Sequence, residues 1–80
     1  MRYHFGRHVK RRARLYGIDL NHVVASVEYH FQHSPIRLHE RIAFIDSGIQ
    51  IEGLPLKIVY IVERETITII TAYPYEKGAP

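Results

Sequence analysis

The chain has 80 residues, 46% hydrophobic and 24% charged, which is typical of one small globular domain and excludes an intrinsically disordered chain. It contains no cysteine, which excludes disulfides and thiolate metal sites and fits a cytoplasmic protein. The net charge of +3 favours an anionic partner such as RNA, and no apolar stretch is long enough to span a membrane.

The first segment is strongly basic, with six of the eleven Lys and Arg residues in the first fourteen positions and no acidic residue before Asp19. Its apolar spacing predicts a helix over residues 5–16, ended by Gly17. Four of its cations face solvent: Arg7, Lys10, Arg11 and Arg14. Arg12 instead falls on the apolar arc, with His8 at its border. A guanidinium on a packed face is costly without a partner, so this placement indicates an anion-binding site.

Asp19 is a suitable N-cap for a second helix over residues 20–29. Four apolar residues of this segment share the face expected to meet the core: Leu20, Val23, Val24 and Val27. Because the link after Gly17 is short, the two helices are expected to pack as a hairpin.

Strands are predicted after Pro35. Residues 40–46 alternate and end at an Asp-Ser-Gly turn over residues 46–48, followed by a short return strand over residues 49–52. Residues 56–62 are almost all apolar and read as a central strand. Residues 66–73 are rich in β-branched side chains and form the last strand, before a short tail.

The last two strands are expected to pair through a two-residue turn at residues 64–65 or a four-residue loop over residues 63–66. Either connection places the same eight side chains on the face that packs against the helices: Leu56, Ile58, Tyr60, Val62, Ile67, Ile69, Thr71 and Tyr73. The predicted fold is α+β, with two N-terminal helices on one face of an antiparallel sheet of three or four strands. It forms one domain over residues 1–80, with a core over residues 5–74, and its exposed edge strands leave homodimerisation open.

Two pairs of side chains could form a catalytic site. His8 and Arg12 are one helical turn apart, and Thr71 and Tyr73 share a strand face. If the first helix packs over that end of the sheet, the four residues converge on a shallow cleft suited to cleaving RNA. His8 would transfer protons and Arg12 would hold the phosphate, while Thr71 and Tyr73 would orient the substrate. Six further cations are expected to bind RNA: Arg7, Lys10, Arg11, Arg14, Arg41 and Lys57.

Simpler roles are open for these residues. His8 could be an ordinary boundary histidine, and Arg12 could pair with Glu28 or Glu40. The basic helix could serve a binding module without turnover. The histidine pairs His4/His8 and His30/His33 have metal-ligand spacing, but no carboxylate stands at a recognised distance from them. No metal or cofactor is therefore expected.

Short motifs at both ends of the chain carry a family resemblance: His8-x-x-x-Arg12, Gly17-Ile18, Val59-Tyr60 and Thr71-Ala72-Tyr73. Over residues 5–74 the chain resembles a compact branch of the RelE/ParE-type toxin superfamily related to BrnT-like toxins. Tyr16 stands where that branch often has an arginine, a role that Arg11 or Arg41 could take. The resemblance implies a RelE-like ribonuclease fold and metal-independent cleavage of mRNA, free or on the ribosome. It also implies a cognate antitoxin protein as partner.

Overall fold

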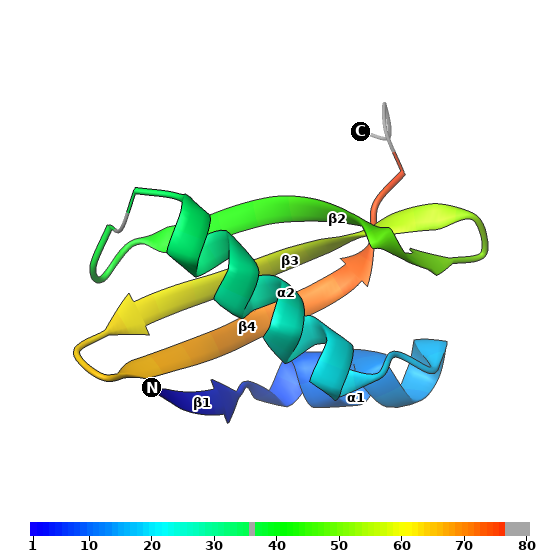
Figure 1. The fold of residues 1–80 in the computed structure, drawn as a ribbon. Helices are drawn as coiled ribbons and strands as arrows, with labels where there is room; N and C mark the ends of the chain where they lie inside the picture. The colour runs from blue at the N-terminus through cyan, green and yellow to red at the C-terminus, as the bar shows by residue number, and fades with distance from the viewer. Residues whose placement is uncertain (36, 77–80) are drawn as a thin grey trace.

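The computed structural model describes residues 1–35 and 37–76. In chain order its elements are β1 (Arg2–Phe5), α1 (Arg7–Tyr16), α2 (Leu20–His33), β2 (Arg41–Ile51), β3 (Leu54–Glu63) and β4 (Thr66–Pro74). The strands form one sheet in the order β1-β4-β3-β2. In Figure 1, α2 crosses one face of this sheet, whereas α1 continues from β1 along the β4 edge. Neither helix in the described ranges is long and apolar enough to cross a membrane.

The predicted caps of both helices are confirmed. Gly17 closes α1 in the left-handed conformation, with its amide donating to the Ala13 carbonyl. The Asp19 carboxylate accepts a hydrogen bond of 2.9 Å from the Asn21 amide at the start of α2. α2 extends four residues beyond the predicted end, to His33, because Phe31 still packs against the core. The predicted helical hairpin is wrong, since the helices diverge and share little direct contact.

The chain begins with a strand that was not predicted, and Phe5, where the predicted first helix starts, is its last residue. β1 runs parallel to β4, with Arg2 opposite Thr66 and Phe5 opposite Ile69. The sheet is therefore mixed rather than wholly antiparallel, although the prediction of an α+β fold with two helices is confirmed. A four-residue strand that pairs with the far end of the chain leaves too little local pattern to be recognised.

β2 passes through residues 46–48, where the sequence predicted a reversal and a short return strand. Asp46 Oδ1 instead accepts a hydrogen bond of 2.8 Å from the Gly48 amide, and the pairing register with β3 shifts beyond Asp46. The local turn is thus absorbed as an irregularity within one strand. The chain reverses later, at Glu52 and Gly53, whose φ angles are +54° and +80°. Positive φ at both positions is what a type I′ hairpin turn requires.

Of the two connections predicted between β3 and β4, the structure has the two-residue turn, because Glu63 lies opposite Thr66. The predicted register then holds as far as Tyr60, which lies opposite Ile69. Ile70 has no partner on β3, so one extra residue enters β4 at this point.

This bulge reverses the facing of every later residue in β4. Ala72 is fully buried opposite Ile58, whereas Thr71 and Tyr73 lie opposite Val59 and Lys57. The prediction that Thr71 and Tyr73 lie on the helix-packed face is therefore wrong. Both side chains belong to the opposite face of the sheet.

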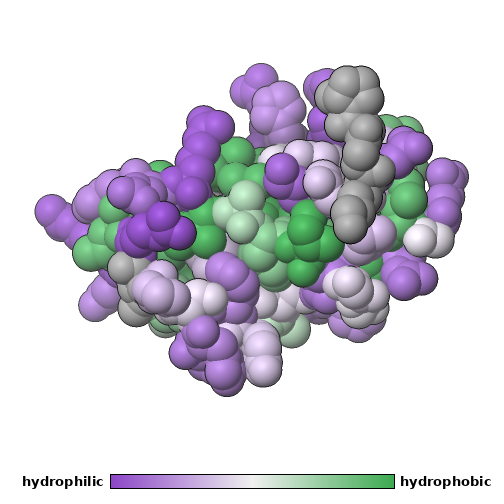
Figure 2. Space-filling model, turned by 90° about the horizontal axis from the view of Figure 1, so that it is seen from above, coloured by the Kyte–Doolittle hydropathy of each residue, from purple (hydrophilic) through white to green (hydrophobic). Residues whose placement is uncertain are grey.

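The core lies between the inner sides of the helices and the face of the sheet that α2 crosses. Its fully buried members come from every element except β1 and β2, and they are Val9, Val23, Val27, Leu56, Ile58, Tyr60, Val62, Ile67, Ile69 and Ala72. Figure 2 views the molecule from the β2 edge and shows hydrophobic residues reaching the surface between hydrophilic ones. Apolar residues are therefore partly exposed along this edge.

Candidate functional site

The face of the sheet opposite α2, called here the open face, is lined by side chains that alternate with the buried ones. On the three long strands these residues include Arg41, Ala43, Ile45, Lys57, Val59, Ile61, Thr68, Thr71 and Tyr73. Those on the central strands are half-buried by their neighbours, whereas those on β2 are exposed. The open face thus has an apolar middle with hydroxyl, aromatic and cationic groups toward its ends.

Arg12 reaches the open face from α1. Its guanidinium carbon lies 5.3 Å from the centre of the Tyr73 ring, within the range of a cation–π contact. Neither Glu28 nor Glu40 pairs with it, and no ion pair to Arg12 occurs within residues 1–35 and 37–76. The guanidinium is half-buried against an aromatic ring, so its N–H donors remain available for an anion.

A second cation continues this arrangement along the open face. Lys57 lies opposite Tyr73, and its Nζ is 5.5 Å from the centre of the Tyr75 ring. Arg12, Tyr73, Lys57 and Tyr75 therefore form a band of alternating charge and aromatic surface, called here the cation–aromatic band. Alternating phosphate-binding groups and stacking platforms suit single-stranded nucleic acid.

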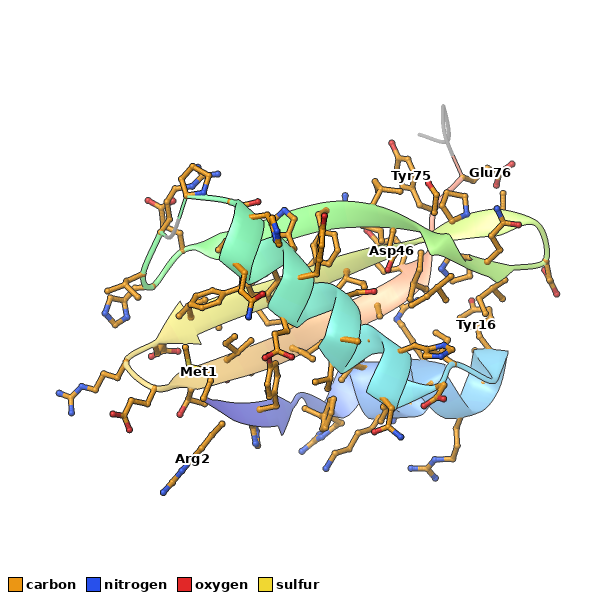
Figure 3. The ribbon with its side chains drawn as sticks, viewed as in Figure 1. Met1, Arg2, Tyr16, Asp46, Tyr75 and Glu76 are labelled. Atoms are coloured by element: carbon orange, nitrogen blue, oxygen red, sulfur yellow. The ribbon has the colours of Figure 1, made fainter. Side chains whose placement is uncertain are left out.

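Tyr75 was missed because the residues after Pro74 were read as a tail. Its amide donates a hydrogen bond of 2.8 Å to the Pro55 carbonyl, which extends the pairing with β3 by one residue. Figure 3 places Tyr75 at the end of the sheet toward which α1 runs, the end that also holds Tyr16. The alternation of Tyr73 and Tyr75 across Pro74 was a signal that could have identified it.

Two local features bring α1 and β4 together. The amide of Gly6 donates a hydrogen bond of 2.9 Å to the Ile69 carbonyl just before the bulge. A Cβ atom on Gly6 would lie 3.2 Å from the Ile70 carbonyl oxygen and 3.3 Å from that of Ile69. Glycine therefore allows the start of α1 to approach β4 closely, and the bulge turns Tyr73 toward Arg12.

His8 lies one turn before Arg12 on α1 and is exposed. It forms no hydrogen bond or ion pair with any residue in the described part of the chain. Thr71 lies on the open face opposite Val59, two residues before Tyr73. The structure thus joins Arg12 directly to Tyr73 and sets His8 and Thr71 beside them on the same two elements.

The remaining predicted cations divide into two groups. Four of them line a shallow groove of about 340 Å³ on the outer side of α1: Arg7, Lys10, Arg11 and Arg14. Lys57 belongs to the cation–aromatic band, but Arg41 lies opposite Ile61 at the other end of the open face. Ile61 lies four positions along β3 from Lys57, a distance of about 13 Å. Arg41 is therefore not positioned to supplement Arg12, and Arg11 lines the groove on the outer side of α1.

The histidine pairs do not assemble a metal centre. His4 lies on β1 and not on a helix with His8, and the Nδ1 atoms of His30 and His33 contact Tyr60 Oη and the Tyr29 carbonyl. No group of three His, Cys, Asp or Glu side chains suited to a metal ion occurs within the described ranges.

Comparison of the chain with protein-family models, with curated proteins and with solved structures gives no match. The site is therefore interpreted from its geometry. It offers a guanidinium with free donors, a nearby imidazole, two aromatic rings, and a row of cations on the adjoining helix. These groups can bind a phosphodiester, stack on a base and transfer a proton.

Proposed function

We propose that this protein is a toxin-type endoribonuclease that cleaves single-stranded RNA at the junction of α1 and the open face. The observation that supports this function best is the contact between Arg12 and Tyr73, with no carboxylate from residues 1–35 or 37–76 paired to the guanidinium. A structural arginine on a packed face would be expected to meet an acid. An arginine held on a ring retains its donors for a phosphate.

In the proposed reaction the RNA 2′-hydroxyl attacks the adjacent phosphorus, and the bond to the 5′-oxygen of the next nucleotide breaks. A cyclic phosphate and a free 5′-hydroxyl result. His8 carries the proton between these oxygens, and Arg12 stabilises the charge that develops on the phosphoryl oxygens. Thr71 binds a phosphate oxygen and Tyr73 stacks on a base. The nucleophile belongs to the substrate, so the reaction requires no covalent enzyme intermediate.

The resemblance to RelE/ParE-type toxins supports the same proposal and adds mRNA as substrate and an antitoxin protein as partner. The order of elements, with two helices before the three long strands, agrees with the α+β arrangement expected for such a protein. The basic groove on the outer side of α1 would then bind the RNA backbone leading into the site.

The test is cleavage of a fluorescent single-stranded RNA in the presence of a chelator. Replacing His8 with alanine is expected to lower the rate by about 10²–10⁴-fold, and Arg12→Ala by about 10²–10³-fold. Two exposed residues away from the site provide matched controls, His22→Ala and Arg37→Ala, which should cleave like the wild type. A substrate with 2′-deoxy sugars should resist cleavage. Equal rates for folded His8→Ala, Arg12→Ala and wild type would disprove the site.

A binding module without turnover is the second candidate, including a toxin relative that has lost activity. The exposure of His8 favours it, because no described side chain fixes the imidazole for proton transfer. This candidate predicts that the wild type binds the fluorescent RNA and leaves it intact. Weakened binding by Arg12→Ala without any product from the wild type would establish it.

A further inference from the structure

A groove of about 590 Å³ lies on the other side of the sheet, between α2 and β2. Its walls include Ser26, Tyr29 and His30 from α2, and Phe44 and Asp46 from β2. This volume lies within the range of sites that hold a small molecule or a side chain. The groove opens beside β2, on the edge of the sheet opposite to β1 and α1.

Two contacts connect the walls of this groove. The His30 ring stacks on Phe44 with 4.2 Å between centroids, and the Ser26 hydroxyl donates to Asp46 Oδ2. Ser26 and His30 are one helical turn apart, and Phe44 and Asp46 are alternate residues of one strand. The members of each pair are therefore about 6–7 Å apart along their element. One planar side chain of a ligand can reach the polar groups of the groove across such a distance.

His30 is fixed by the core beneath it. Its Nδ1 lies 2.7 Å from the hydroxyl of Tyr60, a side chain that is 1% exposed. Burial lowers the pKa of His30, which keeps the imidazole neutral near pH 7. Asp46 is then the side chain that gives the groove its charge, since none of the residues that line it is Lys or Arg.

The carboxylate of Asp46 still has acceptor capacity. Oδ1 accepts from the Gly48 amide and Oδ2 from Ser26, which leaves one lone pair on each oxygen. A guanidinium could donate to both oxygens at once. Tyr29, which is 67% exposed and stacked on His33, offers a ring against which such a group could lie.

The charge of the whole chain favours a cation at this place. Six basic residues and no acid occupy the first fourteen positions, so the rest of the chain has five Lys or Arg and all eight Asp or Glu. Within this portion α2 carries Glu28 and β2 carries Asp46 and Arg41, whereas α1 has five Lys or Arg residues and no acid. A cationic group would be attracted to the β2 side and repelled from α1.

The backbone of β2 supplies a second observation, independent of the groove. β2 is an edge strand of eleven residues, and among the described residues no strand pairs with its outer side. Its regular portion, Arg41 to Asp46, has a charged residue only at each end, and between them lie four consecutive apolar residues with no Lys or Pro to protect the edge. Ile45 is 43% exposed there. This portion can accept an added strand, and it ends at Asp46, where the register shifts.

We propose that the α2–β2 groove and the free edge of β2 together bind an extended peptide of a partner protein that places an arginine side chain on Asp46. The peptide adds as a fifth strand along residues 41–46. Its arginine lies between Tyr29 and the Ser26–Asp46 pair. Lysine fits less well, because an ammonium cannot match both carboxylate oxygens in one plane. This inference does not depend on RNA cleavage, since it concerns the opposite face and edge of the sheet.

The probe is a capped, fluorescent seven-residue peptide of alternating threonine and valine, with arginine in place of the central valine. Fluorescence anisotropy should show saturable binding to the wild-type protein. Asp46→Asn keeps the shape of the side chain and should weaken binding at least about tenfold. Glu52→Gln removes one negative charge at the β2–β3 turn and should bind within about twofold of the wild type. Circular dichroism checks that both variants are folded.

Changes in the peptide test the two halves of the proposal without disturbing the protein. Lysine in place of arginine should weaken binding, and a proline beside the arginine should abolish it by removing a strand hydrogen bond. When the peptide is added to the wild-type protein, the NMR signals that shift should include those of the backbone amides of Ala43, Ile45 and Gly48. Equal affinity for Asp46→Asn and wild type would overturn the proposal. The proposal would also be overturned if guanosine monophosphate bound to the protein more tightly than the peptide does. Self-association of the chain through β2 in the absence of peptide would overturn it as well.

Discussion

At the scale of single residues, Tyr73 tests whether the open face binds RNA bases. Its ring lies between Arg12 and Lys57, where a base could stack. Tyr73→Ala should weaken binding of single-stranded RNA about 5–100-fold, the usual effect of removing one stacking platform. Tyr73→Phe keeps the ring and should bind within about twofold of the wild type. Anisotropy titrations measure both, and unchanged binding by a folded Tyr73→Ala variant would exclude stacking at this position.

His30 makes the stability of the fold depend on pH. Its pKa is lowered by burial, so the unfolded chain binds a proton at this residue more readily than the folded protein does. The free energy of unfolding should therefore decrease as the pH falls from about 7, through the ordinary histidine pKa of about 6.5 and then the lower folded value. Urea denaturation between pH 7.5 and 5 should show that the free energy of unfolding changes less with pH in His30→Gln than in the wild type. An equal slope for the two proteins would contradict this linkage.

At the scale of elements, two substitutions in the β2–β3 turn should change the free energy of unfolding in opposite directions. Gly53 has a φ of +80°, and a Cβ there would meet nothing within 4 Å, so its replacement changes only the backbone energy. Gly53→Ala should lower the free energy of unfolding by about 1–2 kcal/mol. Glu52→Asn creates an Asn-Gly turn and should raise it by about 0.5 kcal/mol or more. Urea denaturation measures both, and a loss of stability in Glu52→Asn would contradict the assigned turn.

The elements also show what the sequence could predict. Local signals were sufficient for α1, α2 and the β3–β4 turn, because caps and apolar spacing act within a few residues. β1 was missed because its pairing is parallel and distant in the chain. The bulge at Ile70 was missed although the Ile69-Ile70 pair interrupts the alternation, a sign that one extra residue enters the strand.

The candidate site was predictable in its residues more than in its geometry. Arg12 was singled out because a guanidinium occurred on an apolar arc, and the structure gives it Tyr73 as a neighbour. The predicted face of the sheet on which they meet was wrong, because the facing of Tyr73 depends on the bulge in β4. Tyr75 was missed although its alternation with Tyr73 is visible in the sequence. The groove of Asp46 and His30 could not be predicted, because the contacts that form it join segments distant in sequence.

At the scale of the whole molecule, positive charge is concentrated at the α1 edge of the sheet. The basic groove on α1 adjoins the cation–aromatic band, whereas β2 at the other edge carries one arginine and one aspartate. Affinity for single-stranded RNA should therefore fall steeply with salt. Arg11→Gln should reduce the slope of log affinity against log salt by about 0.7, as expected for one lost phosphate contact. Arg37→Gln, away from α1, should leave the slope unchanged, and equal slopes for all three proteins would contradict RNA binding along α1.

RNA binding at the junction of α1 and the open face is tested most directly by NMR titration with a 2′-deoxy-substituted single strand, which the protein cannot cleave. Shifts are expected for the side chains of Arg12, Lys57 and Tyr73 and for the amides of α1 and β4. The Gly48 amide, which reports on the α2–β2 groove, should stay in place. Shifts confined to Gly48 and its neighbours, or no shifts at all, would contradict an RNA site at this junction.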